Sequence, residues 1–485
     1  MAEFHRFARQ IGLIGITNLI IGLSGLILIP ILTKTLSIEE YGIYVQILVT
    51  INLVPGIVML GLPYTMVRFL AGAKTREEIQ EGYYSIAVIT IVTAGLASVA
   101  LFILAEPISA ALFDGQTIIT RILALVVFLE CINLLQFNYF RTFQQIKRYS
   151  SLLFFKTCLQ LIMVGGLVFA GYGIFGAVMG LFITDLTLLL IMGVLIVSGI
   201  GFTIPKFTHL REYLSFGLPT VPGNVSSWVV NSSDRYMIGL FLGTAYVGYY
   251  APGYTLGNII HMFVAPLSFM LPAVLSKYYD EKNYQGVQTV LQYSLKYFLM
   301  LAVPSFVGLS ILSKPILTII STPEIAQNGY LITPFTALCA IFFGVYAIIF
   351  QILILEKKTK ITATVWIIAA VINFGLNLVL IPYLGIIGAA VTTLISFVFV
   401  LVIIAYILNT KSQLTLSYNI NIGTFFPILF ASILMIPVLL FLQPVGIVSI
   451  MLTVTLCAII YFILIFVLKG ITKEEIIFFR SMIIR

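Results

Sequence analysis

The sequence has very few charged side chains for its length. Of its 485 residues, 9% are Asp, Glu, Lys or Arg, whereas 60% are hydrophobic. A soluble protein carries about 25% charged residues, because a surface that faces water needs them. The composition therefore excludes soluble domains, and the mean hydropathy of +1.12 indicates an all-α polytopic membrane protein. The excess of 26 basic over 18 acidic residues is then interpreted as membrane orientation and not as nucleic-acid binding.

Residues that bind metals and cofactors are also scarce. The four cysteines and three histidines are scattered, without a Cys-x-x-Cys pair or a His-Glu-x-x-His motif. This spacing predicts neither a disulfide framework nor a metal site. A Walker-type phosphate loop is missing too, so ATP hydrolysis by that route is excluded. We expect no cofactor, no metal and no catalytic residue.

What the chain does have is long apolar runs. A membrane-spanning helix needs about 20 mostly apolar residues. Fourteen such runs are separated by short gaps: 11–33, 43–69, 83–104, 118–140, 152–171, 174–197, 214–240, 247–275, 290–311, 329–355, 361–381, 386–408, 423–442 and 446–468. We expect the first to be a retained helix, because it is long enough to span a bilayer and lacks an Ala-x-Ala-like cleavage site.

The basic residues fix a direction for these helices. If the N-terminus is cytoplasmic, 22 of the 26 Lys and Arg residues fall on the cytoplasmic side, leaving Lys34, Arg121, Arg235 and Lys314 outside. Positive charge is retained on the cytoplasmic side during insertion. The distribution predicts a multi-pass protein of the cytoplasmic membrane with both termini in the cytoplasm.

Two short motifs recur at nearly the same distance along the chain. Gly42, in a Tyr-Gly-Ile-Tyr segment, is matched 206 residues later by Gly248 in Val-Gly-Tyr-Tyr. Gly173, which begins Gly-Ile-Phe-Gly-Ala, is matched 212 residues later by Gly385 in Gly-Ile-Ile-Gly-Ala. A duplicated six-helix unit gives two pseudo-symmetric parallel lobes. We predict an N-lobe at 1–205, a C-lobe at 206–412, and two further helices with a cytoplasmic C-terminus at 413–485.

Three segments carry a resemblance to a known family. They are residues 33–44, in which Ser37 stands where Gly is usual, Gly61-Leu62-Pro63 with Arg68, and residues 234–252. Across essentially the whole chain, the sequence resembles the polysaccharide transporter family of the multidrug/oligosaccharidyl-lipid/polysaccharide (MOP) flippase superfamily. That family includes Wzx-type oligosaccharide flippases and is similar to the lipid II flippase MurJ and to the MATE multidrug extruders. The resemblance implies fourteen helices in a 6+6+2 arrangement.

Charged groups at membrane depth are expensive and mark candidate sites. Glu130 lies 9 residues after Arg121 and 11 before Arg141, which puts it roughly 13–17 Å from each, near mid-depth. Asp185 lies at a similar depth in the sixth run. Because burial favours the neutral form of a carboxylate, these two are candidates for binding a coupling cation or proton. Their alternative role is a hydrogen-bonded pair with neighbouring Asn or Ser side chains.

Other polar residues are candidates for binding an anionic sugar lipid. Arginine suits phosphate because its planar fork contacts two oxygens. The candidates for substrate binding are Arg235, Asp234, Asn231 and Asn224 on the polar seventh run, with Lys156 and Arg141 at the cytoplasmic mouth. Their alternatives are an Arg235–Asp234 pair and positive-inside anchors. Lys296 is expected to reach the membrane surface as a snorkelling lysine.

These observations predict a flippase that moves a polyprenyl phosphate- or diphosphate-linked oligosaccharide across the cytoplasmic membrane, for surface polysaccharide or glycan synthesis. Alternating access through a central cationic cavity would carry the headgroup. The expected partners are that substrate, membrane lipids, a coupling cation or proton, and a polymerase or glycosyltransferases. Two alternatives remain: a cation-coupled multidrug antiporter of the same superfamily, and a membrane polysaccharide polymerase or glycosyltransferase.

Overall fold

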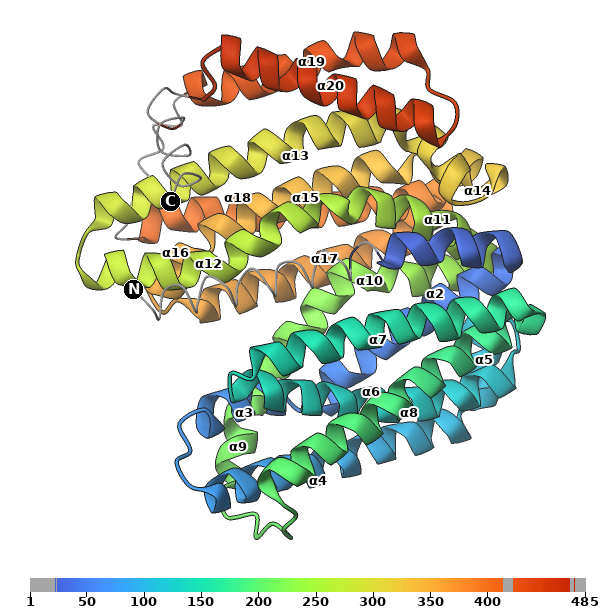
Figure 1. The fold of residues 1–485 in the computed structure, drawn as a ribbon, viewed down its shortest axis with the longest axis vertical. Helices are drawn as coiled ribbons and strands as arrows, with labels where there is room; N and C mark the ends of the chain where they lie inside the picture. The colour runs from blue at the N-terminus through green and yellow to red at the C-terminus, as the bar shows by residue number, and fades with distance from the viewer. Residues whose placement is uncertain (1–21, 23, 413–421, 472–474, 476–485) are drawn as a thin grey trace. The chain divides into compact units, whose positions relative to one another are not determined.

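The computed structural model of the protein describes residues 22, 24–412, 422–471 and 475 (Figure 1). Over these residues it consists of helices and connecting turns without strands, so the predicted all-α fold is confirmed. Its contacts divide the chain into two compact units, residues 1–251 with 366–392 and residues 252–365 with 393–485. This division puts the seventh predicted run with the first unit. The lobe boundaries drawn from the internal repeat stay a prediction.

The first unit is a bundle in which α6 packs against α4 and α8, and α7 packs against α8. Helix α10 packs against α2. The helices are α2 (Ile38–Val58), α3 (Leu62–Leu70), α4 (Arg76–Ile103), α5 (Ala105–Leu112), α6 (Thr117–Thr142), α7 (Ile146–Leu167), the π-turn η1 (Val168–Tyr172), α8 (Gly173–Ile200), α9 (Leu210–Gly217), the 3₁₀ turn η2 (Leu218–Thr220), α10 (Val221–Leu242), the start of α11 (Thr244–Gly257), most of α17 (Thr359–Leu384) and the start of α18 (Ile386–Lys411).

The second unit is organised around the long helix α13, which packs against α15 and α19. Its buried apolar cluster joins α13, α19 and α20, and the Tyr461 hydroxyl donates to the Met300 carbonyl at 2.8 Å. Its helices, besides the remainders of α11, α17 and α18, are the 3₁₀ turn η3 (Asn258–Ile260), α12 (His261–Asp280), α13 (Tyr284–Ile320), α14 (Pro323–Gly329), α15 (Ile332–Ile349), α16 (Gln351–Leu355), α19 (Ile422–Leu442) and α20 (Ile447–Val467).

The described helices cover thirteen of the fourteen predicted runs, and the first run is covered in part by Ser24–Thr35. By length and hydropathy, the described residues contain ten membrane-spanning helices, or eleven when the bent pair Thr244–Asn258 and His261–Asp280 is one span. The difference from fourteen has physical reasons. Ile146–Ile200 is one stretch of 55 residues, about 80 Å of helix against a hydrocarbon core of about 30 Å, so it crosses twice. Helix α10 is too polar to qualify, because Asn, Ser, Asp and Arg occupy much of it.

Helices α7 and α8 are separated by the glycine motif that the sequence repeats. Gly173 has a φ of 55° and Gly385 a φ of 63°, a left-handed conformation that glycine adopts without strain. Three residues later, a Cβ on Gly176 would contact the backbone of Leu167, and a Cβ on Gly388 would contact the backbone of Leu380. In both copies, a glycine with positive φ stands at the start of the second helix, and the glycine three residues later packs against the backbone of the first helix.

The predicted single helix at 43–69 is two helices. Leu60 and Gly61 have φ values of 51° and 71°, which interrupt the helix between α2 and α3. Pro63 stands in the first turn of α3, where its missing N–H removes no helical hydrogen bond. A Cβ on Gly61 would overlap the carbonyl of Gly217, so α9 approaches this break closely.

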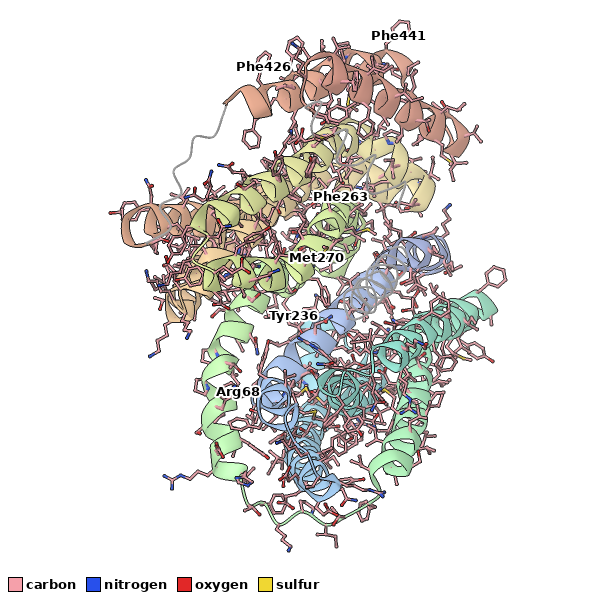
Figure 2. The ribbon with its side chains drawn as sticks, turned by 60° about the vertical axis from the view of Figure 1, so that its left-hand side comes forward. Arg68, Tyr236, Phe263, Met270, Phe426 and Phe441 are labelled. Atoms are coloured by element: carbon pink, nitrogen blue, oxygen red, sulfur yellow. The ribbon has the colours of Figure 1, made fainter. Side chains whose placement is uncertain are left out.

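Large apolar side chains are exposed on the helix surfaces of both units. Phe169 of η1 is 82% exposed and Phe441 of α19 is 88% exposed. Phe426, on the same helix as Phe441, is exposed as well (Figure 2). Soluble proteins rarely expose apolar patches of this extent. Together with the hydropathy of the spans, this surface identifies a multi-pass membrane protein.

Candidate functional site: a cationic cavity in the first unit

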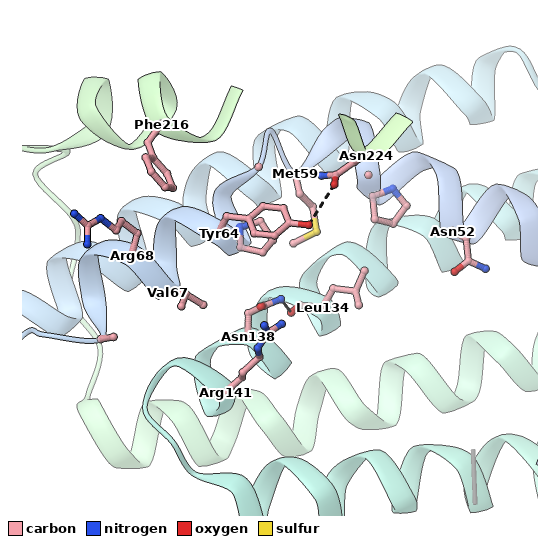
Figure 3. Close-up of a pocket in the computed structure, with 15 residues that line it drawn as sticks. Asn52, Met59, Tyr64, Val67, Arg68, Leu134, Asn138, Arg141, Phe216 and Asn224 are labelled. Atoms are coloured by element: carbon pink, nitrogen blue, oxygen red, sulfur yellow. Dashed lines mark hydrogen bonds between the residues drawn. The ribbon is translucent and has the colours of Figure 1, made fainter. Parts of the chain in front are cut away.

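A cavity of about 740 Å³ opens between the α2–α3 break and helices α6, α9 and α10 (Figure 3). We call it the larger cavity. Figure 3 shows Tyr64 and Arg68 of α3 on one side and Asn138 and Arg141 of α6 on the other. Its polar lining residues are Asn52, Tyr64, Arg68, Asn138, Arg141 and Asn224. Tyr64 and Arg68 both belong to α3, the short helix that follows the α2–α3 break.

The wall around α3 is held by specific contacts. The Thr65 hydroxyl donates to the Tyr213 carbonyl of α9 at 3.1 Å. The ring of Phe69 packs on the ring of Phe216 with centroids 5.5 Å apart. The Tyr64 hydroxyl donates to Asn224 Oδ1 of α10 at 3.2 Å. These contacts fix the positions of an aromatic ring, a phenol and an amide at the edge of the cavity.

The larger cavity is electropositive. Arg68 and Arg141 both line it, and its lining includes no Asp or Glu. Among the described residues, neither guanidinium has an ion-pair or hydrogen-bond partner. Two guanidinium groups without counter-charges attract an anion, and phosphate oxygens match their fork of donors.

A second, smaller cavity of about 360 Å³ lies between α6 and α7. It shares Leu134, Asn138 and Arg141 with the larger cavity, so the two adjoin along one face of α6. Glu130 and Lys156 also line the smaller cavity. Glu130 and Arg141 lie on the same face of α6, roughly 16 Å apart along the helix.

Lys156 forms an ion cluster with the two carboxylates predicted at mid-depth. Its Nζ lies 2.6 Å from Glu130 Oε2 and 3.4 Å from Asp185 Oδ1. Asn133 Nδ2 donates to the Asp185 carbonyl at 2.9 Å and to Asp185 Oδ1 at 3.4 Å. We call Lys156, Glu130 and Asp185 the triad. The sequence placed Lys156 among substrate-binding residues and the carboxylates among ion-binding residues, whereas the structure joins all three.

Arg235 is in a different environment. Its side chain is 7% exposed, and its Nη1 donates to Asp234 Oδ1 at 2.8 Å and also to the Asn231 carbonyl. The Tyr250 hydroxyl donates to Asp234 Oδ2 at 2.6 Å, and the guanidinium lies over the Tyr250 ring at 5.5 Å. Arg235, Asp234 and Asn231 line neither cavity. Arg235 is thus paired with Asp234, as in the alternative interpretation of the sequence. A phosphate contact would require the guanidinium to leave Asp234.

Two of the six residues predicted to bind substrate, Arg141 and Asn224, line the larger cavity, and Lys156 lines the smaller one. Arg68, Tyr64 and Asn138 were not predicted as site residues. A signal was available for two of them. Asn138 precedes Arg141 by three residues and so shares its helix face, and Arg68 follows the Gly-Leu-Pro break on a short helix.

Bent and broken membrane-spanning helices around a polar, cationic cavity are the architecture of a membrane transporter. The chain belongs to the polysaccharide biosynthesis protein family, whose model matches residues 31–324. The model of the lipid II flippase MurJ matches residues 243–467. These matches confirm the resemblance to the flippase superfamily.

Individual proteins agree with this assignment. A probable low-salt glycan biosynthesis flippase of Haloferax volcanii, Agl15, is 25% identical over 215 residues, 44% of this chain and 45% of that protein. The match therefore spans about half the length of the curated relative. The lipid II flippase MurJ in an inward closed conformation has a similar fold, with a TM-score of 0.75 and 19% identity over 96% of this chain and 99% of that one. An inward-facing MATE multidrug resistance transporter has a TM-score of 0.68 and 13% identity over 82% of this chain and 100% of that one.

Proposed function

We propose that the protein is a flippase for a polyprenyl phosphate- or diphosphate-linked oligosaccharide. The observation that carries this proposal is the larger cavity, in which Arg68 and Arg141 have no acidic partner among the described residues. Lipid tails cannot solvate a phosphate, so its passage requires fixed positive charge in a polar space. The glycan flippase relative and the two family models support this substrate class.

The size and lining of the larger cavity suit one part of such a substrate. A volume of about 740 Å³ falls within the range of small-molecule sites, roughly 300–1,000 Å³. It accommodates the phosphates and the first sugars, while the prenyl chain remains in the lipid. The amides of Asn52, Asn138 and Asn224 are suited to hydrogen-bond sugar hydroxyls.

The same lining disfavours the multidrug antiporter alternative. A cationic drug entering the larger cavity would meet two guanidinium groups and no carboxylate among the lining residues. Like charges in a poorly hydrated space repel each other strongly. An anionic headgroup is attracted by the same two guanidinium groups.

The proposed orientation places both termini in the cytoplasm and the protein in the cytoplasmic membrane, with flipping from the inner to the outer leaflet. Glycosyltransferases would then supply the lipid-linked glycan on the cytoplasmic side, and a polymerase or transferase would consume it outside. The excess of Lys and Arg in the cytoplasmic gaps supports this direction.

Reconstitution tests the function. Liposomes containing the protein receive a fluorescent polyprenyl diphosphate oligosaccharide, and a membrane-impermeant quencher measures how fast it reaches the other leaflet. We expect Arg68→Gln and Arg141→Gln each to slow this rate about tenfold, and the double variant to match empty liposomes. Arg121→Gln is the matched control, because Arg121 lies on α6 outside both cavities and contacts the Phe102 ring.

No acceleration by the wild-type protein over empty liposomes would overturn the proposed function. A wild-type rate that the Arg68→Gln, Arg141→Gln double variant preserves would instead remove the larger cavity as the route.

A further inference from the structure

The triad has an unbalanced formal charge. One ammonium group serves two carboxylates, contributed by α6, α7 and α8, so the cluster carries one excess negative charge when both carboxylates are ionised. The side chains are only 6–19% exposed. An uncompensated charge at this depth is costly. The triad is therefore suited to accept one more positive charge.

Asn133, which donates to Asp185 of the triad, also has spare hydrogen-bonding capacity. Asn133 is fully buried and its amide nitrogen is committed to Asp185. Its Oδ1 has no hydrogen-bond partner among the described residues. A buried acceptor without a donor is unfavourable, because it has lost its hydrogen bonds to water. A protonated Asp185 carboxyl group is a hydrogen-bond donor, which is the kind of partner that Asn133 Oδ1 lacks.

Lys156 lines the cavity that adjoins the one proposed for the anionic headgroup. Lys156 and Glu130 line the smaller cavity, and Asn138 and Arg141 belong to both cavities. A lysine ammonium is a point charge on a flexible four-carbon stem. It can exchange a carboxylate for a phosphate without movement of its helix.

We propose that the triad is a charge-exchange site that takes up one proton when an anionic headgroup binds next to it, a step that rests on the function proposed above. The Lys156 ammonium moves from Glu130 and Asp185 to a phosphate oxygen. One proton from water then binds a carboxylate oxygen, because two adjacent carboxylates share a proton rather than both remain ionised. When the headgroup leaves, the proton is released and Lys156 returns.

The residues around the triad indicate that the proton binds to the triad and not to another titratable group. Asp185 is the only charged residue of α8. Other titratable side chains near the triad are the thiols of Cys131 and Cys158 and the phenols of Tyr44 and Tyr149. The remaining charged residues on the helices that pack against α6, α7 and α8 lie toward the helix ends: Glu39, Glu40, Arg68, Arg76, Glu77, Glu78, Glu81, Glu106, Arg121, Arg141, Lys147 and Arg148.

Calorimetry on the purified full-length protein tests the exchange. Farnesyl diphosphate serves as the probe, and titrations at pH 7.5 in buffers of different ionisation enthalpy give the number of protons taken up per probe bound. We expect about one for the wild type, from the proposed one-for-one exchange. We expect the Glu130→Gln, Asp185→Asn double variant and Lys156→Gln to lose this uptake, while Arg121→Gln retains it. Protons exchanged by the probe itself are common to all variants.

Each outcome decides between two statements. Binding without proton uptake by the wild type, or uptake that all variants share equally, would overturn the charge exchange and leave the flippase proposal intact. No binding of farnesyl diphosphate by the wild type would overturn the charge exchange, and the liposome assay then decides the flippase proposal separately. The wild-type measurement is sufficient for this, so a variant that fails to fold does not remove the test.

Discussion

Gly42 on α2 and Gly248 on α11 lie against each other's helices. A Cβ on Gly42 would overlap the carbonyl oxygen of Thr244 and lie 3.2 Å from the backbone nitrogen of Gly248. A Cβ on Gly248 would lie 2.5 Å from the carbonyl oxygen of Ile38. The two copies of the repeated Gly-x-Tyr motif thus make a reciprocal backbone contact, which explains why both positions are glycine.

This contact predicts that Gly42→Ala and Gly248→Ala destabilise the protein. The added methyl group meets backbone atoms, which cannot move aside like a flexible side chain. Overpacking of this kind costs about 1–3 kcal/mol. Thermal unfolding in detergent measures the effect, with Gly166→Ala on α7 as the control, since a Cβ there has nothing within 4 Å. Equal melting temperatures for all three variants would contradict the close approach.

A buried ion pair in the second unit yields another prediction. Lys296 Nζ lies 2.7 and 2.8 Å from the two oxygens of Glu475, whose Oε1 also accepts from the Tyr297 hydroxyl at 3.0 Å. Removing one partner leaves a buried charge and costs about 3–5 kcal/mol. We expect Lys296→Met or Glu475→Gln to lower the melting temperature by several degrees.

The double variant Lys296→Met, Glu475→Gln should recover part of that loss, because it leaves no charge behind. An additive loss in the double variant would show that the two side chains do not interact.

The helices were predictable because hydropathy reports burial in lipid directly, and the internal repeat because its glycines recur at nearly the same distance along the chain. The position of Lys296 was not. The sequence shows that a lysine lies near a helix end, but its partner Glu475 is 179 residues away. Its predicted contact with the membrane surface is wrong, because the side chain is buried.

The depth of the candidate residues in the membrane was predictable from the sequence, but the direction in which their side chains point was not. Each step along a helix rotates the side chain by about 100°, so a polar stretch such as α10 does not reveal which residues face a cavity. Asn224 lines the larger cavity, whereas Asn231 donates to the Ser227 carbonyl of its own helix at 2.7 Å. Lys156 is 26 residues from Glu130 and 29 from Asp185, and only the packing of three helices joins them.

Variants around the Arg235–Asp234 pair distinguish a structural role of Arg235 from a role in substrate binding. Asp234→Asn should destabilise the protein more than Tyr250→Phe, because the first leaves the Arg235 guanidinium buried without a counter-charge. Loss of the Tyr250 hydrogen bond to a charged group costs about 1.5–3 kcal/mol. Thermal unfolding checks the order. Neither change should alter the affinity for farnesyl diphosphate, and a weaker affinity with unchanged stability would return Arg235 to the substrate site.

The lining of the larger cavity contains no carboxylate. Introducing one therefore tests whether the positive charge of the cavity governs binding. Asn138→Asp keeps the side-chain size and places a negative charge three residues from Arg141, in both cavities. The new carboxylate neutralises a guanidinium and repels the phosphate, and we expect the affinity for farnesyl diphosphate to fall at least about tenfold, or 1.4 kcal/mol. Asn328→Asp, at an exposed position of α14, changes the net charge of the protein equally. If the two variants bound the probe with the same affinity, overall charge and not the cavity would govern binding.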